Sequence, residues 1–331
     1  MLDPYMGGGT TALEAMSVNR KVIGSDINSL SLFVAKVKTT PLGPEEEKEV
    51  KVWVRTSVKT QSCRHELVSD DESAPKNLSA PSVRWLKKTI ALFKQSASQL
   101  PSDGSRDFAK CILLNVGQWA LNGRRRIPTV TEFRARVESV ACEMLQSNSE
   151  LANSVNWVSS EHRPILRRAD AEHIYLDEKI VSAGPVDLVV TSPPYPGIHM
   201  LYHRWQVDGR KETDAPYWIA GCLDGAGASH YNFADRKLAA EGRYFDKALR
   251  SFSGIRSVMK PGSVLIQMIA FSNRARQLPK YLRMMEKAGF NEHREAGERR
   301  IWRSIPRRRW HATLQGRTSS SKEVVLVHVA R

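Results

Sequence analysis

The feature that most constrains the fold is a short apolar run that ends in a double proline. Residues 186–190 read Val-Asp-Leu-Val-Val, which predicts a buried strand, and Thr191-Ser192-Pro193-Pro194-Tyr195 follow directly. Each proline fixes its own φ and lacks an N–H, so the strand cannot continue through this segment. The residue before each proline is held extended as well. The result is a stiff loop with carbonyls and one aromatic ring at a strand's carboxyl end, where open α/β sheets bind ligands.

A second motif lies at the start of the chain. Asp3-Pro4-Tyr5-Met6-Gly7-Gly8-Gly9-Thr10-Thr11 precedes a helical stretch, and residues 21–28 predict a second strand that ends at Asp26. The glycines permit positive φ and close approach of the backbone to a ligand, and the helix offers free N–H groups at its positive end. Asp26 is placed to accept hydrogen bonds from ribose hydroxyls, although capping a helix or a turn is the alternative role.

The two motifs together resemble those of the amino-group DNA methyltransferases, which methylate the exocyclic nitrogen of cytosine or adenine. The segment from Ser192 to Tyr195 is similar to the family's (Ser/Asp/Asn)-Pro-Pro-(Tyr/Phe/Trp), whose Ser form is more usual for cytosine-N4 enzymes and whose Asp form is more usual for adenine-N6 enzymes. The segment from Asp3 to Thr11 is similar to Asp-Pro-Phe-x-Gly-x-Gly-Thr-Thr, which binds S-adenosylmethionine, with Tyr5 in place of the usual Phe. The resemblance covers residues 1–38 and roughly 165–331, and a rigid loop without catalytic function remains the alternative for the double proline.

The resemblance implies two sets of site residues. The catalytic candidates are Ser192, Pro193, Pro194 and Tyr195, and the cofactor-binding candidates are Asp3, Tyr5, Gly7, Gly9, Thr10, Asp26 and Asp170. It implies that the Ser192 side chain and the Pro193 carbonyl accept the N–H groups of the target amine, and that Tyr195 stacks on a base flipped out of double-stranded DNA. None of the four cysteines follows a proline, which argues against cytosine-C5 chemistry.

The expected fold class is α/β, a doubly wound Rossmann-like sheet of the class I methyltransferase type with a mainly helical insertion. We divide the chain into residues 1–38, the first part of the cofactor-binding methyltransferase domain; 39–164, the helical insertion; and 165–331, the catalytic part. Helical periodicity in the insertion covers 83–98, 106–121 and 131–148, with Thr129 or Thr131 as a helix start. The insertion either takes part in target recognition or is a helical cap with no role in DNA binding.

Four further elements are expected in the last part of the chain. The pattern predicts a helix over 244–259 ended by a turn at Lys260-Pro261-Gly262, a strand over 263–271, a helix over 275–288 and a strand over 323–330. The segment after the double proline contains His199, His203 and Arg204, which could reach the flipped base or its phosphate. The alternative is a helix that packs Tyr202 and Trp205 on the sheet.

The first strand is expected to be truncated. Only Met1 and Leu2 precede Asp3, whereas a strand in the centre of such a sheet needs about five residues. We therefore hypothesise that the chain is truncated, has a misannotated start, or is one half of a split enzyme whose other half is a partner chain.

The charge balance favours a polyanionic partner. The chain has 50 Lys and Arg against 35 Asp and Glu, a formal net charge of +15, with clusters at residues 124–126, 299–303 and 307–311. Such charge promotes association with nucleic acid, although each cluster could equally be a solvated basic face. The four cysteines and nine histidines are scattered, so no metal site and a reduced, cytoplasmic setting are expected. No run of about 18 apolar residues and no secretory signal is found.

The sequence leaves several functions open. Cytosine-N4 methylation of DNA, as in a restriction–modification system with a nuclease partner, is favoured over adenine-N6 methylation. An RNA amino-methyltransferase and an inactive nucleic-acid-binding fragment are the other candidates.

Overall fold

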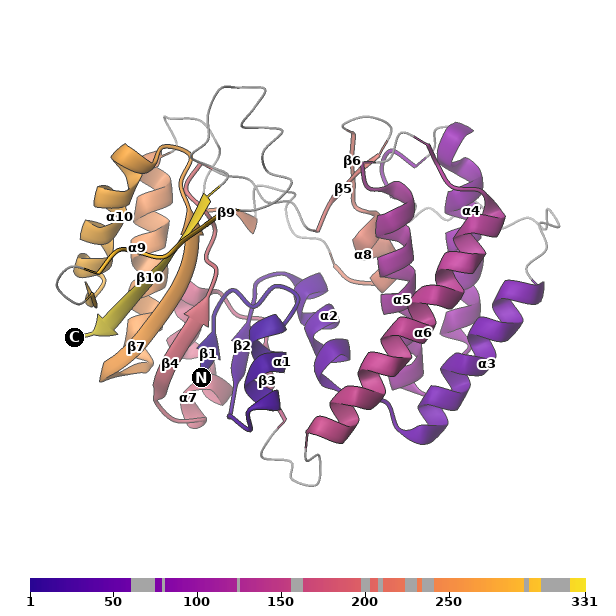
Figure 1. Cartoon of the computed structure of the whole chain (residues 1–331), viewed down its shortest axis with the longest axis horizontal. Coiled ribbons are helices and arrows are strands. Elements are labelled where there is room, and N and C mark those ends of the chain that lie inside the picture. The colour runs from indigo at the N-terminus through magenta and orange to yellow at the C-terminus, as the bar shows by residue number, and fades with distance from the viewer. Residues whose placement is uncertain are drawn as a thin grey trace. The chain divides into compact units, whose positions relative to one another are not determined.

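The computed structural model describes residues 1–60, 75–78, 81–123, 126–155, 163–197, 203–207, 211–223, 231–233, 241–294, 298–304 and 322–331. The chain divides into two compact units, each discontinuous in sequence. The sheet unit comprises residues 1–35, 159–200 and 225–331, and the helical unit comprises residues 36–158 and 201–224 (Figure 1).

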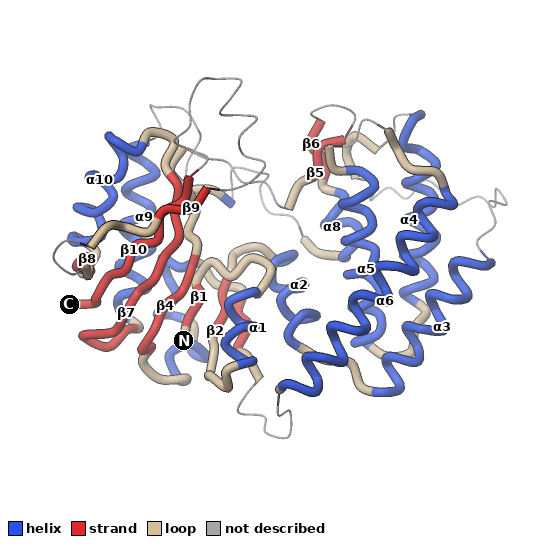
Figure 2. The backbone as a smooth tube through the Cα atoms, viewed as in Figure 1, coloured by secondary structure: helices blue, strands red, loops and turns tan. Residues whose placement is uncertain are grey.

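The described strands of the sheet unit form one eight-stranded sheet (Figure 2). The order is β3-β2-β1-β4-β7-β10-β8, and β9 also pairs with β10. The five neighbouring strands β3, β2, β1, β4 and β7 run parallel, and β10 is antiparallel to β7, β8 and β9. This strand order confirms the expected α/β class, a doubly wound Rossmann-like sheet of the class I methyltransferase type. The strands are β1 Leu2–Asp3, β2 Ile23–Ser25, β3 Ile165–Arg167, β4 Val186–Thr191, β7 Met259–Ala270, β8 Phe290–Glu292, β9 Trp302–Ser304 and β10 Lys322–Ala330.

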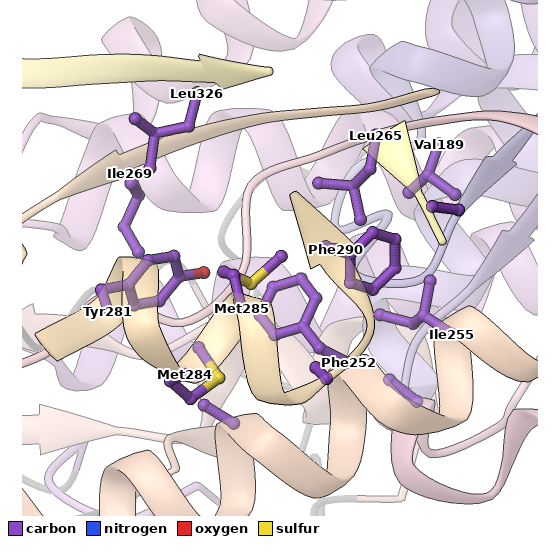
Figure 3. Packing of buried hydrophobic residues seen from close by; sticks show 14 of the residues in the cluster. Val189, Phe252, Ile255, Leu265, Ile269, Tyr281, Met284, Met285, Phe290 and Leu326 are labelled. Carbon is purple, nitrogen blue, oxygen red and sulfur yellow. The ribbon is translucent and has the colours of Figure 1, made fainter. Parts of the chain in front are cut away.

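The helices of the sheet unit bury its core against the strands. They are α1 Thr10–Ser17, residues 29–35 of α2 Ser29–Thr39, the 3₁₀ helix η2 Ala171–Leu176, α7 Glu178–Ser182, α9 Glu241–Ser257 and α10 Arg274–Lys287. In the view of Figure 1, α9 and α10 lie behind the strands and α1 in front of them. Figure 3 shows Phe252 of α9 and Tyr281 and Met285 of α10 packed with the strand residues Leu265 and Ile269. Edge-to-face aromatic pairs such as Phe252 with Tyr281 contribute about 0.5–1.5 kcal/mol beyond the burial of their area.

The predicted turn at Lys260-Pro261-Gly262 is wrong in its placement. Helix α9 ends at Ser257, and β7 begins at Met259, so the three residues lie inside the strand rather than before it. The pairing of β7 with β4 shifts register along this stretch, and Gly262 has φ of +82°. The proline and glycine therefore produce an irregularity of the kind seen at β-bulges, instead of separating a helix from a strand.

The helical unit is built mainly of long helices. Its elements are the end of α2 Ser29–Thr39, α3 Pro44–Thr60, α4 Pro81–Ser98, α5 Asp103–Leu121, α6 Val130–Ser154, the two-stranded sheet of β5 Trp205–Val207 and β6 Lys211–Thr213, and α8 Ala215–Ala220. The three helices expected in the insertion correspond to α4, α5 and α6. Thr129 caps α6 by a capping box with Glu132, which confirms one of the two expected helix starts.

Two elements of the helical unit differ from the sequence prediction. Helix α3 was not among the predicted helices. Its three glutamates, Glu45 to Glu47, occupy the first turn, where their negative charge interacts favourably with the positive end of the helix. One of the two alternatives for the segment after the double proline placed Trp205 on a helix; Trp205 lies instead in β5, where its side chain is buried. Over the described part of the chain, we find no helix with the length and apolar content that a membrane span requires.

Candidate functional site

All predicted site residues follow the carboxyl ends of parallel strands. The glycine-rich loop follows β1, Asp26 follows β2, Asp170 comes after β3, and Ser192 follows β4. Because these strands are parallel and adjacent, their carboxyl ends meet at one edge of the sheet. This is the edge at which doubly wound sheets bind their ligands.

The glycine-rich loop is a compact turn between β1 and α1. The Met6 N–H donates to the Ser25 carbonyl at 3.0 Å, and the Gly9 N–H donates to the Met6 carbonyl at 2.9 Å. Gly7 and Gly9 have φ of +49° and +73°, in the left-handed region that favours glycine. Helix α1 begins at the exposed Thr10, and Gly9 at its N-cap makes no side-chain hydrogen bond to its first turn.

Gly9 also allows a close approach between the loop and α2. A Cβ atom at this position would lie 2.7 Å from the Ala35 Cβ and 3.0 Å from the Ala35 Cα. At Gly7 and Gly8 an added Cβ would have no heavy atom within 4 Å. The loop therefore packs against α2 at Gly9, and the space around Gly7 and Gly8 is open on the side where a Cβ would lie.

The Asp26 carboxylate accepts two backbone N–H groups. Oδ2 accepts from Gly7 at 3.0 Å and Oδ1 accepts from Asn28 at 2.8 Å, so this side chain ties the glycine-rich loop to the end of β2. Burial raises the pKa of Asp26 to about 6, against the lowering effect of these hydrogen bonds. A carboxylate oxygen has room for more than one hydrogen bond, so both oxygens can accept further donors.

Asp3 connects the two motifs. Its Oδ1 accepts from the Thr191 Oγ1 at 2.6 Å and from the Tyr5 N–H at 3.2 Å, and the side chain is 4% exposed. Burial raises the pKa of this carboxyl, although the hydrogen bonds from Thr191 and Thr11 oppose the shift. Asp3 thus fixes the start of the glycine-rich loop to the start of the double-proline loop.

Tyr5 projects into an aromatic cluster beneath the loops. Its ring meets Phe233 edge-to-face with centroids 5.9 Å apart, and Phe233 lies 5.5 Å from the ring of Tyr244. Burial raises the pKa of the Tyr5 hydroxyl, although the nearby Ser251 hydroxyl opposes the shift. The structure thus places the Tyr5 ring in an aromatic cluster, whereas the resemblance implied a contact with the cofactor.

The double-proline loop is held on both sides. The Tyr244 hydroxyl donates to the Pro194 carbonyl at 2.7 Å, and the Tyr195 hydroxyl donates to Oε1 of Glu323 at 2.9 Å. Ser192 is exposed and Pro193 is buried. The loop therefore presents the Ser192 hydroxyl to solvent from a fixed backbone.

Asp170 caps η2 and binds α9. Its Oδ1 accepts from the Glu172 N–H at 3.0 Å, and its Oδ2 lies 3.8 Å from the Lys247 Nζ. Gly254 of α9 packs tightly on this turn, since a Cβ there would lie 2.4 Å from the Ala171 carbonyl oxygen. Asp170 is thus partly engaged in structure, and its carboxylate is partly exposed at the same edge of the sheet.

The sequence analysis did not identify the residues that hold the double-proline loop. Tyr244 comes from α9 and Glu323 from β10, so neither is near residues 192–195 in the chain. One signal was present for Glu323: it is a carboxylate at the start of an apolar strand, and a buried charge requires a partner.

The basic clusters are partly neutralised where they are described. Arg126 pairs with Glu132, Arg300 pairs with Glu292 through Nε at 2.7 Å, and Arg303 pairs with Glu323. Arg124, Arg125 and residues 307–311 lie outside the described residues, as do His199 and Tyr202. The described His203 lies in the helical unit, where its ring meets Tyr217 edge-to-face.

Comparison with known proteins gives one short sequence match. No family model matches the chain. A stretch of 46 residues is 44% identical to the Type II methyltransferase M.MvaI of Kocuria varians. That stretch is 14% of this chain and 10% of the relative, so the match spans a tenth of the relative's length.

Solved structures are similar only at a low level. The rRNA methyltransferase aviRa from Streptomyces viridochromogenes is 10% identical, with 99% of this chain and 75% of that chain covered and a TM-score of 0.31. TrmN from Thermus thermophilus is 13% identical, with coverage of 59% and 41% and a TM-score of 0.24. These similarities are too low to assign a function, and the fold class rests on the strand order.

Proposed function

We propose that this chain transfers a methyl group from S-adenosylmethionine to an exocyclic amino group of a base in DNA. The base we favour is cytosine, methylated at N4, because the double-proline motif carries Ser192. The short match to a type II methyltransferase supports the same class of reaction.

The observation that carries the proposal is the hydrogen bond between Asp3 and Thr191. This bond of 2.6 Å joins the start of the glycine-rich loop to the residue before Ser192. A methyl transfer requires the donor and the acceptor to meet at a fixed distance and angle, and preorganisation of this kind accounts for much of the acceleration in such reactions. Two loops fixed to each other at one buried carboxylate meet this requirement.

The residues at the edge of the sheet fit the proposed cofactor. Asp26 would accept the ribose hydroxyls, the glycine-rich loop would lie against the amino-acid part, and Asp170 would face the adenine. The space around Gly7 and Gly8 supports this fit, because among the described residues no heavy atom beyond the chain neighbours lies within 4 Å of a Cβ added at either position. When bound, the cofactor supplies an electrophilic methyl group on a sulfonium.

The residues of the double-proline loop would bind and orient the target amine. An exocyclic amine is a poor nucleophile because its lone pair is delocalised into the ring. The Ser192 hydroxyl and the Pro193 carbonyl would accept its two N–H groups and stabilise the positive charge that develops on nitrogen. Tyr195 would stack on the flipped base. No covalent bond to the protein is required.

The sheet unit would thus carry both sites, and the helical unit is our candidate for target recognition. Double-stranded DNA is the proposed substrate, and a restriction nuclease or a second half-chain is a proposed partner. The formal net charge of +15 supports a polyanionic substrate without distinguishing DNA from RNA.

Replacement of Ser192 tests the proposal. With S-adenosylmethionine labelled in its methyl group and unmethylated phage DNA, Ser192→Ala should lower the turnover rate by about 10²- to 10³-fold, because one acceptor for the reacting amine is lost. Calorimetric titration should give the same affinity for S-adenosylmethionine in the variant and in the wild type, since Ser192 belongs to the other loop.

Ser98→Ala is the matched control, because Ser98 is an exposed serine on α4 in the helical unit. Its turnover should equal that of the wild type. Unchanged turnover in Ser192→Ala would contradict the catalytic role, and label in RNA but never in DNA would contradict the substrate. If the wild-type chain binds no S-adenosylmethionine, the alternative of an inactive nucleic-acid-binding fragment is supported instead.

A further inference from the structure

A buried carboxylate lies next to the aromatic ring of the double-proline motif. Glu323 is the second residue of β10 and is 3% exposed. It pairs in register with Ala270, the last residue of β7, and therefore lies at the carboxyl edge of the parallel strands. No part of the reaction proposed above uses this side chain.

The two oxygens of Glu323 are divided between two partners. Oε1 accepts from the Tyr195 hydroxyl at 2.9 Å, and Oε2 accepts from the Arg303 Nε at 3.0 Å. Arg303 lies directly opposite Glu323 in the pairing of β9 with β10, and its own side chain is 59% exposed. The exposed guanidinium of Arg303 thus supplies a positive charge to the Glu323 carboxylate. The Tyr195 hydroxyl reaches the other oxygen of this carboxylate from the double-proline loop.

Burial of a carboxylate is costly unless charged and polar partners compensate it. An apolar residue at this position would avoid that cost, as Val324 and Leu326 do one and three residues further along the same strand. A carboxylate, unlike an apolar side chain, can accept a hydrogen bond from the Tyr195 hydroxyl in a defined direction. A tyrosine ring bonded at its hydroxyl has a fixed plane as well as a fixed position.

We propose that Glu323 is a positioning residue that fixes the ring plane of Tyr195 for stacking on the target base, and that Arg303 holds the Glu323 carboxylate in place. This inference rests on the proposed function. Stacking of a base on an aromatic face depends on the plane of the ring, so a ring free to tilt would leave the target amine misplaced relative to the methyl donor.

A double-mutant cycle tests this role. Tyr195→Phe keeps the ring and removes the hydroxyl, and Glu323→Ala removes the acceptor. With labelled S-adenosylmethionine and unmethylated phage DNA, each change should lower kcat roughly tenfold, since a misplacement of about 1 Å costs up to 10²-fold. The double variant should lose no more than either single variant, because both changes remove the same hydrogen bond. The KM for S-adenosylmethionine should stay within about twofold of the wild type throughout.

A second variant protects the test against misfolding. Glu323→Ala leaves Arg303 without this partner, whereas Glu323→Gln keeps the shape and one acceptor oxygen. If Glu323→Ala does not fold, Glu323→Gln takes its place in the cycle. Glu323→Gln should lower kcat by less than Glu323→Ala. Added to Tyr195→Phe, it should cause no further loss of kcat.

Glu292→Gln is the matched control. Glu292 is also a strand glutamate paired with an arginine, and it lies on β8 opposite His328, away from the double-proline loop. Its kcat should equal that of the wild type within about twofold.

Two results would overturn the inference. If the losses from Tyr195→Phe and Glu323→Ala multiply, or if Glu323→Ala keeps the wild-type kcat in an active enzyme, the positioning role is wrong and the proposed function stands. If the wild-type chain transfers no methyl group to DNA, the proposed function and this role fall together.

Discussion

At the scale of single residues, the two carboxylates nearest the glycine-rich loop have different surroundings. Asp3 is 4% exposed and accepts from the Thr191 hydroxyl, so its carboxylate is committed to holding two loops together. Asp26 is only partly buried and binds backbone N–H groups, so it can also face a ligand. Burial raises the pKa of both groups, and that of Asp26 lies at about 6.

The raised pKa of Asp26 predicts a pH dependence of cofactor binding. Only the ionised carboxylate accepts hydrogen bonds well from two ribose hydroxyls, and below pH 6 the folded chain holds Asp26 increasingly protonated. The Kd for S-adenosylmethionine should therefore be constant above about pH 7 and should rise as the pH falls, approaching tenfold per pH unit below about 6. Calorimetric titration between pH 5 and 8 measures this.

Asp26→Asn is the control for this pH dependence. The variant should bind S-adenosylmethionine about 10- to 100-fold more weakly at pH 8, by analogy with other lost hydrogen bonds to charged groups. Its Kd should also change little between pH 5 and 7, since the titrating group is gone. A wild-type Kd that is the same at pH 5 and pH 8 would contradict the role of Asp26.

The sequence was informative at this scale where residues are neighbours in a motif. Asp3, Gly9, Asp26 and Ser192 follow strand ends, and their common location could be predicted from strand order alone. The pairing of Tyr195 with Glu323 could not, because the two residues are 128 positions apart and meet only through the pairing of β10 with β7.

At the scale of elements, the glycine-rich loop depends on one close contact. Gly9 has φ of +73° and lies at the N-terminus of α1, and its Cα faces Ala35 of α2. Any side chain here is strained twice, by the backbone conformation and by the approach of α2.

Gly9→Ala should therefore destabilise the loop and α1. The left-handed backbone costs an alanine roughly 1–2 kcal/mol, and overpacking against Ala35 adds typically 1–3 kcal/mol. Amide hydrogen exchange in α1, followed by mass spectrometry, should show the loss of protection. Affinity for S-adenosylmethionine should fall with it.

Gly8→Ala is the matched change. An added Cβ at Gly8 would have no heavy atom within 4 Å, so exchange in α1 should match the wild type. Equal protection in Gly9→Ala and Gly8→Ala would show that the contact with Ala35 is unimportant.

Element prediction succeeded where the apolar period was regular and failed where charge or turn residues dominated. Helices α4, α5 and α6 have clear apolar faces. Helix α3 begins with Pro44 and three glutamates, which resemble a break but are favourable in a first helical turn. Lys260-Pro261-Gly262 contains residues that favour turns, yet these residues lie within β7, where the pairing of β7 with β4 shifts register.

At the scale of the whole molecule, each compact unit is assembled from separated parts of the chain. Residues 201–224 come soon after the double-proline loop in the chain but belong to the helical unit. Their place there depends on packing within that unit. A Cβ on Gly117 of α5 would lie 3.0 Å from both the Ile219 Cδ1 and the Trp205 Cη2. Contacts between residues about 90 to 100 positions apart leave no local pattern in the sequence.

Nucleoside mass spectrometry identifies the base that the chain methylates. DNA without methylated bases is incubated with the chain and with S-adenosylmethionine that carries a deuterated methyl group, and is then digested to nucleosides. We expect deuterated N4-methylcytosine in DNA. Deuterium only at C5 of cytosine, only in RNA, or in no base of DNA while the cofactor still binds would contradict this expectation.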